Sequence, residues 1–201
     1  MLTSTFFASL GLFVAKDFFD AESCARIRSE LRVAAGSQAR IYRKGTASID
    51  ENKRRTTRVE ADMPTMSFVE ERLRGLMPAL ESHFHLVLTG CETPQFLVYK
   101  EGDFFRQHLD HGPEPDDPQY LKDRRVSAVV FLNGQAEEPG PDAYCGGSLK
   151  LYGLIDEPLW KACGFPLMGE PGMLVAFRPD VIHEVEPVTH GERYTIVSWF
   201  L

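Results

Sequence analysis

The spacing of apolar side chains divides the chain into a helix-rich half and a strand-rich half. Over residues 21–35 apolar positions recur every three or four residues, which predicts an amphipathic helix packed on a core. Asp20 is placed to cap this helix and Gly36 to end it. The apolar stripe consists of Cys24, Ile27, Leu31 and Ala34. A second helix is predicted over 66–85, and Pro78 inside it predicts a kink or a break.

After residue 90 the pattern changes to short apolar runs separated by turn residues. These runs are predicted as strands at 95–100, 104–110, 125–133, 146–152, 172–177, 182–188 and 193–200. Because no helical pattern separates them, they favour an antiparallel sandwich or barrel. The long connections 111–124 and 153–171 are candidate lids or substrate walls. We therefore expect one mainly β domain over 1–201, with helical support over about 1–90 and the core over about 91–201.

The remaining amino-terminal segments carry no strong signal. Residues 1–16 are apolar but lack a basic start, so we expect a core strand or a lead-in, not a signal peptide or a membrane span. The basic cluster 53–55 and Arg58 fits either an anion-contacting patch or a solvated hairpin or loop, and we favour the solvated segment.

Composition narrows the possible partners and the compartment. The chain has 29 acidic and 22 basic residues, a formal charge of −7, which speaks against non-specific nucleic-acid binding. The four cysteines are widely spaced and form no C-x-x-C pair. A disulfide framework is therefore not expected, and a reducing cytoplasm is the simpler location.

Candidate metal chemistry centres on the stretch Y-K-E-G-D-F-F-R-Q-H-L-D at 99–110. His108 and Asp110 are two residues apart, so an extended backbone points both side chains to one face. His183, in the run V-I-H-E-V, is the best third ligand. Two histidines and one carboxylate on one face of a metal form the ligand set of non-haem Fe(II) oxygenases.

The last predicted strand adds a buried cation to this picture. Alternation places Arg193, Thr195, Val197 and Trp199 on one face and Tyr194, Ile196 and Phe200 on the other. An inward-facing arginine needs a partner. Either the carboxylate of a bound ligand or an internal acid would satisfy Arg193.

Six ordered segments together resemble the 2-oxoglutarate- and Fe(II)-dependent dioxygenases, in particular their prolyl-4-hydroxylase-like branch with its oxygen-sensing and bacterial members. The segments are 99–110, R-V-S-A-V-V-F-L-N at 125–133, G-G-S-L-K-L-Y at 146–152, P-G-M-L-V-A-F at 171–177, H-E-V-E-P-V at 183–188 and G-E-R-Y-T-I-V-S-W-F at 191–200. This resemblance implies a double-stranded β-helix, or jelly-roll, core flanked by amino-terminal helices.

The resemblance also implies roles for single residues. His108, Asp110 and His183 match the iron ligands, and Arg193 matches the residue that binds the distal carboxylate of 2-oxoglutarate. Two further matches, Tyr99 and Trp199, line the co-substrate pocket. Phe131 departs from the pattern, because the oxygen-sensing enzymes have a tyrosine there whose hydroxyl contacts the same carboxylate. Tyr99, Ser127 or Thr195 is expected to supply the missing contact.

The implied activity is hydroxylation of an unactivated C–H bond, with release of succinate and CO2. It implies Fe(II), 2-oxoglutarate and O2, with ascorbate as reductant. The implied substrate is a prolyl residue in a protein or peptide, or a small metabolite; no nucleic-acid or membrane partner is expected. Two alternatives stay open: a non-catalytic cupin-like module that binds a metal or a small acid, and a zinc hydrolase, for which no general base is evident.

Overall fold

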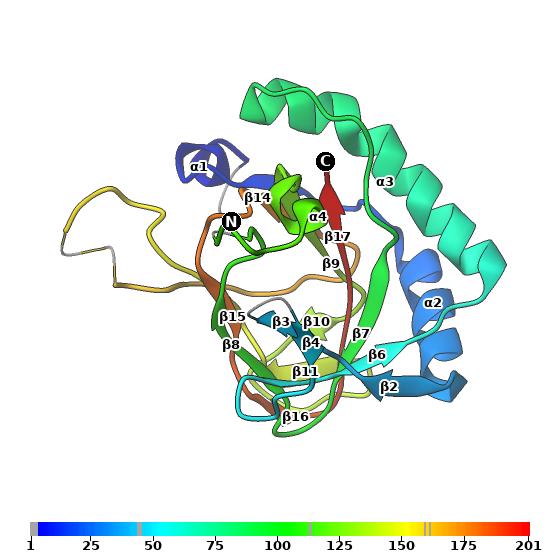
Figure 1. The fold of residues 1–201 in the computed structure, drawn as a ribbon. Coiled ribbons are helices and arrows are strands. Elements are labelled where there is room, and N and C mark those ends of the chain that lie inside the picture. The colour runs from blue at the N-terminus through cyan, green and yellow to red at the C-terminus, as the bar shows by residue number, and fades with distance from the viewer. Residues whose placement is uncertain (1–3, 44–45, 113, 159, 161) are drawn as a thin grey trace.

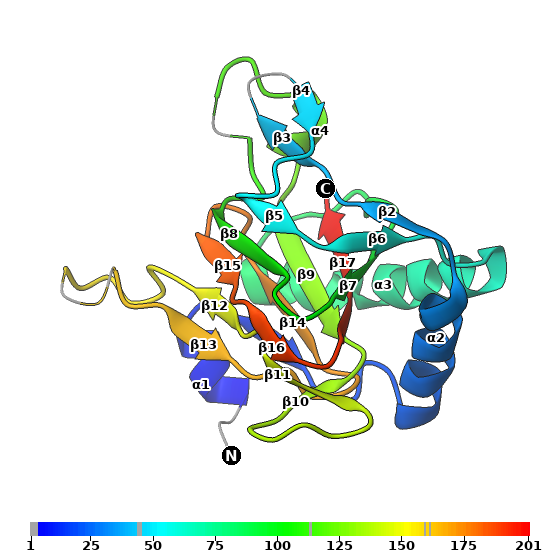
Figure 2. The ribbon, with the colours of Figure 1, turned by 90° about the horizontal axis from the view of Figure 1, so that it is seen from below.

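The computed structural model describes residues 4–43, 46–112, 114–158, 160 and 162–201. Its two largest sheets are antiparallel and face one another (Figure 1 and Figure 2). The seven-stranded sheet comprises, in spatial order, β1 (Phe13–Ala15), β14 (Leu174–Phe177), β9 (Val126–Phe131), β17 (Arg193–Phe200), β7 (Gln95–Tyr99), β6 (Thr57–Val59) and β2 (Gly36–Gln38). The five-stranded sheet comprises β13 (Phe165–Leu167), β12 (Leu149–Leu151), β15 (His183–Val185), β8 (Phe104–His108) and β5 (Arg54–Arg55).

Two smaller sheets complete the strand structure. A three-stranded sheet is formed by β10 (Gly134–Gln135), β11 (Ala143–Gly146) and β16 (Val188–His190). A hairpin is formed by β3 (Ile41–Arg43) and β4 (Thr46–Ser48). Strands therefore form close to every predicted strand position after residue 90, with bounds that differ by a few residues.

Apolar side chains from both large sheets fill part of the space between them. The buried members are Val129, Phe131, Val175 and Phe177 from the seven-stranded sheet and Leu149, Leu151 and Leu167 from the five-stranded sheet. Each such burial contributes about 1.5–3 kcal/mol, which holds the sheets face to face. This two-sheet arrangement agrees with the predicted jelly-roll.

Helices cover the opposite face of the seven-stranded sheet (Figure 1). They are α2 (Ala21–Val33) and α3 (Met63–Phe84), which pack on Tyr194, Ile196 and Phe200 of β17. The alternate residues of β17 line a cavity between the sheets. The predicted division of β17 into two faces is therefore confirmed, and it directs the polar face of the strand to the site.

The amino-terminal ends of both helices follow from local capping. The Oδ1 atom of Asp20 accepts a hydrogen bond of 2.7 Å from the backbone N–H of Ser23, as predicted for α2. Asp62 caps α3 in the same way through Thr65, also at 2.7 Å, so α3 begins earlier than the apolar pattern indicated. The helix continues through Pro78, so of the predicted kink or break the break does not occur.

The amino-terminal half is less purely helical than predicted. Its first segment forms a short helix, α1 (Ser4–Ser9), before β1 pairs with β14. Moreover, β2 and β6 extend the seven-stranded sheet, and β5 extends the five-stranded sheet. These strands are too short for a period-2 pattern to reveal, and long-range pairing decides their conformation.

Two segments project from the same end of the molecule (Figure 2). One is the β3–β4 hairpin, and the other carries α4 (Gln119–Lys122) within the predicted 111–124 connection. None of the helices in the described part of the chain has the length and apolar character that crossing a bilayer demands. All four cysteines are free thiols, and the cytoplasmic location stays a prediction.

Candidate active site

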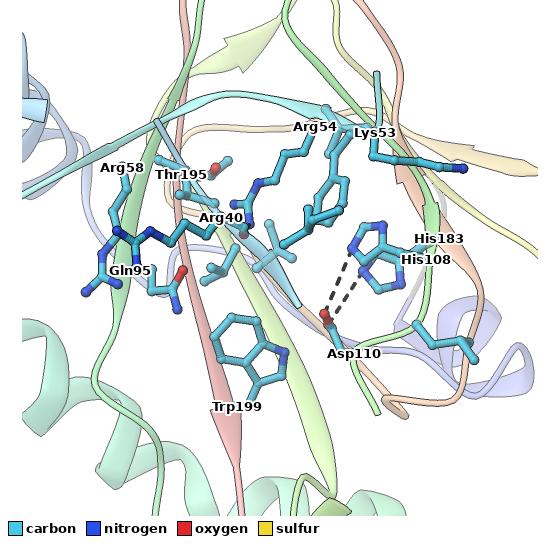
Figure 3. A pocket seen from close by; sticks show the side chains of 18 of the residues that line it. Arg40, Lys53, Arg54, Arg58, Gln95, His108, Asp110, His183, Thr195 and Trp199 are labelled. Atoms are coloured by element: carbon cyan, nitrogen blue, oxygen red, sulfur yellow. Dashed lines mark hydrogen bonds and ion pairs between the residues drawn. The ribbon is translucent and has the colours of Figure 1, made fainter. Parts of the chain in front are cut away.

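The three predicted metal ligands meet between the two large sheets (Figure 3). His108 ends β8, and His183 begins the neighbouring strand β15, where the two residues are paired in register. Asp110 follows just beyond the end of β8. Its Oδ2 and Oδ1 atoms lie 3.5 Å from Nε2 of His183 and 3.9 Å from Nε2 of His108. All three ligand atoms lie within 4.8 Å of one another, a spacing that allows them to share one metal ion.

Backbone carbonyl groups orient both imidazole rings. Nδ1 of His108 lies 2.8 Å from the carbonyl oxygen of Arg106, and Nδ1 of His183 lies 2.9 Å from that of Val181. Because a carbonyl oxygen only accepts, each Nδ1 carries the proton and each Nε2 presents its lone pair. Phe105 also stacks on the His108 ring, with centroids 3.5 Å apart. The rings are thus fixed in the tautomer that binds a metal.

The charges of the three groups favour a cation. Burial raises the pKa of Asp110, but the nearby imidazoles of His183 and His108 and a hydrogen bond from Trp199 outweigh it and lower the pKa to about 2. Burial, and secondly His183, hold the pKa of His108 well below its usual value. At neutral pH, Asp110 is therefore ionised and His108 is neutral, as metal binding requires.

A second layer of contacts supports Asp110. The Trp199 indole is stacked against the Arg124 guanidinium, whose Cζ lies 3.6 Å from the ring centroid. Arg124 also donates to both carboxylate oxygens of Glu92, at 2.6 and 2.9 Å, and to the backbone carbonyl of Asp110 at 3.0 Å. Neither Arg124 nor Glu92 lies in a metal-ligand pattern, so the sequence carries no signal for this role.

Arg193 is a buried cation with unused hydrogen-bond donors. It is 1% exposed, and its Nη1 donates to the Thr195 hydroxyl at 3.2 Å. Its Nε and Nη2 atoms have no hydrogen-bond partner in the described part of the chain. No carboxylate pairs with it among those residues either, so an internal salt bridge does not account for its burial. Unsatisfied buried donors are costly, and the carboxylate of a bound acid would satisfy them.

Arg193, Thr195, Trp199 and the three metal-ligand candidates line one cavity of about 920 Å³. A keto acid with a second carboxylate fits this donor set, because one end would reach Arg193 and the other the metal centre. Tyr99 also lines the cavity, and its ring centroid lies 5.0 Å from Cζ of Arg193. Ser127 is buried, and its hydroxyl has no hydrogen-bond partner among the described residues, but it is not among the residues that line the cavity.

Tyr144 is a neighbour of Arg193 that the sequence did not reveal. Its hydroxyl is buried without a hydrogen-bond partner in the described part of the chain, and its ring centroid lies 6.0 Å from Cζ of Arg193. Burial raises the Tyr144 pKa, and Arg193 opposes this rise. The two glycines after Cys145 make this approach possible. A Cβ atom on Gly147 would lie 3.2 Å from Cδ of Arg193 and 3.3 Å from Cε2 of Tyr144. The pairing of β11 with β16 shifts register between Cys145 and Gly146, which marks a β-bulge at this approach.

The basic cluster 53–55 and Arg58 corrects one prediction. We favoured a solvated hairpin or loop, but Arg54 is only 8% exposed, and Lys53, Arg54 and Arg58 all line the cavity. The reason is the pairing of β5 with β8, which sets Arg54 opposite Phe105 and its guanidinium 4.5 Å from that ring centroid. Arg55 is not among the lining residues; it is exposed, and its Nη2 donates to the Gly102 carbonyl.

A family model described as the 2OG-Fe(II) oxygenase superfamily matches residues 94–201. This segment is more than half of the chain and contains the three metal-ligand candidates and Arg193. The chain belongs to the 2OG-Fe(II) oxygenase superfamily. The resemblance seen in the sequence is thereby confirmed, and the superfamily name itself specifies Fe(II), 2-oxoglutarate and an oxygenase reaction.

Relatives within this superfamily include PKHD-type hydroxylases. One from Synechococcus sp. (strain JA-2-3B'a(2-13)) is 28% identical over 134 residues, which cover 67% of this chain and 50% of the relative. Another, from Rippkaea orientalis, is 26% identical over 168 residues, covering 84% and 64%. The chain thus spans about half to two thirds of the length of these relatives.

Solved structures support the fold over nearly the whole chain. A prolyl-4-hydroxylase of Pseudomonas putida superposes with a TM-score of 0.70 at 26% identity, covering 96% of this chain and 94% of that one. A prolyl hydroxylase of Trichoplax adhaerens, solved with a hypoxia-inducible-factor peptide fragment, has a TM-score of 0.71 at 17% identity, covering 98% and 86%. The predicted jelly-roll fold is confirmed.

Proposed function

We propose that this chain is an Fe(II)- and 2-oxoglutarate-dependent dioxygenase that hydroxylates an unactivated C–H bond. One observation carries the proposal: a cation-binding triad and a buried, unsatisfied guanidinium line the same cavity. In this proposal His108, Asp110 and His183 hold the metal, and Arg193 holds the distal carboxylate of 2-oxoglutarate. Thr195 orients Arg193 through their hydrogen bond. Tyr99 and Trp199 form the walls of the co-substrate pocket.

Bound Fe(II) would supply the oxidising chemistry, and the protein would supply position and charge. One oxygen atom of O2 enters the substrate as a hydroxyl group, and the other enters succinate. Two electron pairs reduce O2. One comes from the C1–C2 bond of 2-oxoglutarate, whose C1 carboxylate leaves as CO2, and the other comes from the substrate C–H bond. The carbonyl groups of Arg106 and Val181 would keep the proton on Nδ1 of His108 and His183, so that Nε2 of each ring stays available to the metal.

The substrate is proposed as a prolyl residue in a protein or peptide. Support comes from the PKHD-type hydroxylases and from the 26%-identical prolyl-4-hydroxylase of Pseudomonas putida. Ascorbate is proposed as the reductant that keeps the metal as Fe(II).

Turnover of 2-oxoglutarate without substrate tests the reaction class. The chain with Fe(II), ascorbate and O2 is expected to release succinate, and a peptide substrate is expected to gain the mass of one oxygen atom. Arg193→Ala is expected to raise the 2-oxoglutarate concentration needed for half-maximal rate, whereas Asp110→Ala is expected to abolish succinate release. A chain that binds metal and 2-oxoglutarate but never forms succinate would instead be the non-catalytic binding module.

A further inference from the structure

The cavity that holds the proposed active site is basic, although the whole chain is acidic. Among its described lining residues are seven Lys or Arg and four Asp or Glu, against a formal charge of −7 for the chain. Several of these charges are already committed: Arg193 to the co-substrate, Asp110 to the metal, and Arg124 to Glu92. The surplus is positive and comes mostly from Arg40, Lys53, Arg54, Arg58 and Arg106.

Arg54 is the innermost member of this surplus. Arg54 is 8% exposed, and its Nε atom is buried without a hydrogen-bond partner in the described part of the chain. Its Nη1 donates at 3.2 Å to the Arg40 carbonyl, and its side chain also interacts with Tyr99. Neither of these partners is anionic, and the acid that attracts Arg54 electrostatically, Asp110, belongs to the proposed metal-ligand set.

The other basic side chains lie further out. In Figure 3 the Arg54 side chain extends into the space between Thr195 and the two histidines, and Arg40 and Arg58 lie on its far side from the histidines. Arg58 has an acid neighbour, Glu60, at 3.8 Å. Arg40, Lys53 and Arg54 make no ion pair with a carboxylate in the chain as described. This excess of cations over carboxylates in the cavity lining favours an anionic ligand.

The shape of the entrance favours a chain over a small molecule. The cavity lining includes Ile41 and Ala47 of the β3–β4 hairpin and Tyr120 and Leu121 of α4. These are the two segments that project together at one end of the molecule (Figure 2). The entrance therefore lies between two projecting walls, which is room for an extended peptide whose flanking residues reach the basic side chains.

We propose that the substrate is an extended peptide segment that carries Asp or Glu side chains next to the residue to be hydroxylated. Arg54 binds the acidic side chain closest to the metal centre, and Arg40, Lys53 and Arg58 bind those further along. This inference rests on the proposed function, because it names the substrate class of the same site. It gives Lys53, Arg54 and Arg58 the anion-contacting role, which was the less favoured of the two alternatives open from the sequence.

Binding of matched synthetic peptides tests the proposal. The probes are fluorescein-labelled peptides of one sequence around a central proline, with Glu, Gln or Lys at the flanking positions. Fluorescence anisotropy is measured with the chain loaded with Mn(II) and 2-oxoglutarate, after binding of both has been established separately. The Glu peptide is expected to bind at least about tenfold more tightly than the Gln peptide, with a preference that shrinks at high salt because exposed charges are screened.

Charge reversal at the entrance supplies the matched variant. Arg40 and Lys53 are exposed, so the double variant Arg40→Glu/Lys53→Glu is expected to fold. It should lose at least about tenfold in affinity for the Glu peptide, gain affinity for the Lys peptide, and keep Mn(II) and 2-oxoglutarate binding. Arg74→Glu is the control, because exposed Arg74 lies on α3, across the seven-stranded sheet from the cavity.

Each outcome decides a separate point. A chain that binds neither Mn(II) nor 2-oxoglutarate refutes the proposed function itself. If the chain binds both Mn(II) and 2-oxoglutarate but has equal affinity for the Glu and Gln peptides, or binds neither peptide, only the acidic-peptide proposal is overturned. The same holds if the double variant behaves like the wild type or like Arg74→Glu. Binding of free glutamate in place of the Glu peptide would make the cavity a small-acid site and would also overturn it.

Discussion

The Nε2 atom of His183 faces the Oδ2 atom of Asp110 at 3.5 Å. His183 begins β15, whereas Asp110 lies just beyond the end of β8, the strand that pairs with β15. A divalent cation is expected to stabilise the chain by joining them. At a free Mn(II) concentration 100-fold above Kd, the gain is about 2.7 kcal/mol. For a chain of this size that corresponds to a rise in Tm of roughly 5–10 °C.

The variant Asp110→Ala is expected to lose this Mn(II)-dependent rise in Tm, because it removes the only charged member of the triad. Thermal unfolding with and without Mn(II) measures the effect. His190→Ala is the control, since His190 is exposed and lies outside the triad. An undiminished Mn(II) shift in Asp110→Ala would place the metal elsewhere.

Trp199 is expected to hold Asp110 in its metal-binding orientation. Trp199→Phe keeps an aromatic ring against Arg124 but removes the N–H that donates to the Asp110 carboxylate. Loss of such a supporting hydrogen bond costs about 10- to 100-fold in metal affinity. Calorimetric titration with Mn(II) measures the loss. Trp160→Phe, at a residue 55% exposed, should leave the affinity unchanged; equal effects of the two variants would contradict the assignment.

The candidate site residues that could be predicted from the sequence were predicted from local backbone geometry. The i, i+2 spacing of His108 and Asp110 and the alternation along β17 are backbone properties, so they were readable before folding was known. The approach of His183 to His108 is a long-range contact that no local spacing fixes, and the structure brings their ring centroids to 4.1 Å. The binding roles of these residues stay predictions that the experiments above address.

Arg54 and Tyr144 escaped prediction because long-range contacts decide their environment. A Lys-Arg-Arg run is typical of a solvated loop, and no local pattern in it predicts that β5 pairs with β8 and buries the middle residue. Tyr144 faces Arg193 only because the chain bulges after Cys145 and because β11 pairs with β16. The Tyr-x-Gly-Gly pattern contains the bulge signal but not the identity of the partner.

Tyr144 is expected to position Arg193 for the co-substrate. Tyr144→Phe removes the hydroxyl next to the guanidinium and leaves the ring volume nearly unchanged. This hydroxyl has no hydrogen-bond partner in the described part of the chain, so it is available to the pair that Arg193 forms with the bound carboxylate. A hydrogen bond to a charged group contributes about 1.5–3 kcal/mol, so the Kd for 2-oxoglutarate should rise roughly tenfold or more. Calorimetry with 2-oxoglutarate in the presence of Mn(II) measures this. The affinity for Mn(II) itself should not change, which separates positioning of Arg193 from general damage.

A matched control for this prediction is Tyr152→Phe. The Tyr152 hydroxyl donates to Glu184, whose side chain the strand β15 turns away from the metal-ligand face occupied by His183. Its removal should leave the 2-oxoglutarate affinity at the wild-type value. If both tyrosine variants weakened 2-oxoglutarate binding equally, the hydroxyl of Tyr144 would have no special relation to Arg193.

Two glycines with the same backbone conformation should differ sharply in their tolerance of alanine. Gly172 has φ +77°, and a Cβ atom there would lie 1.9 Å from the carbonyl oxygen of Phe19. Gly11 has φ +72°, but no atom of the described residues lies within 4 Å of its Cβ position. Left-handed backbone costs an alanine about 1–2 kcal/mol at either site. Gly172→Ala adds overpacking of about 1–3 kcal/mol, because backbone cannot move aside as a flexible side chain does.

Urea unfolding of Gly172→Ala and Gly11→Ala measures the difference in the free energy of unfolding. The excess loss in Gly172→Ala is expected because Gly172 exchanges backbone hydrogen bonds with Phe19 and Phe131, through its carbonyl at 3.2 Å and its N–H at 2.8 Å. This position therefore ties the start of α2 to the end of β9, where Phe131 packs against the cavity wall beside Arg193. Equal losses in the two variants would mean that this junction is loose enough to absorb a methyl group.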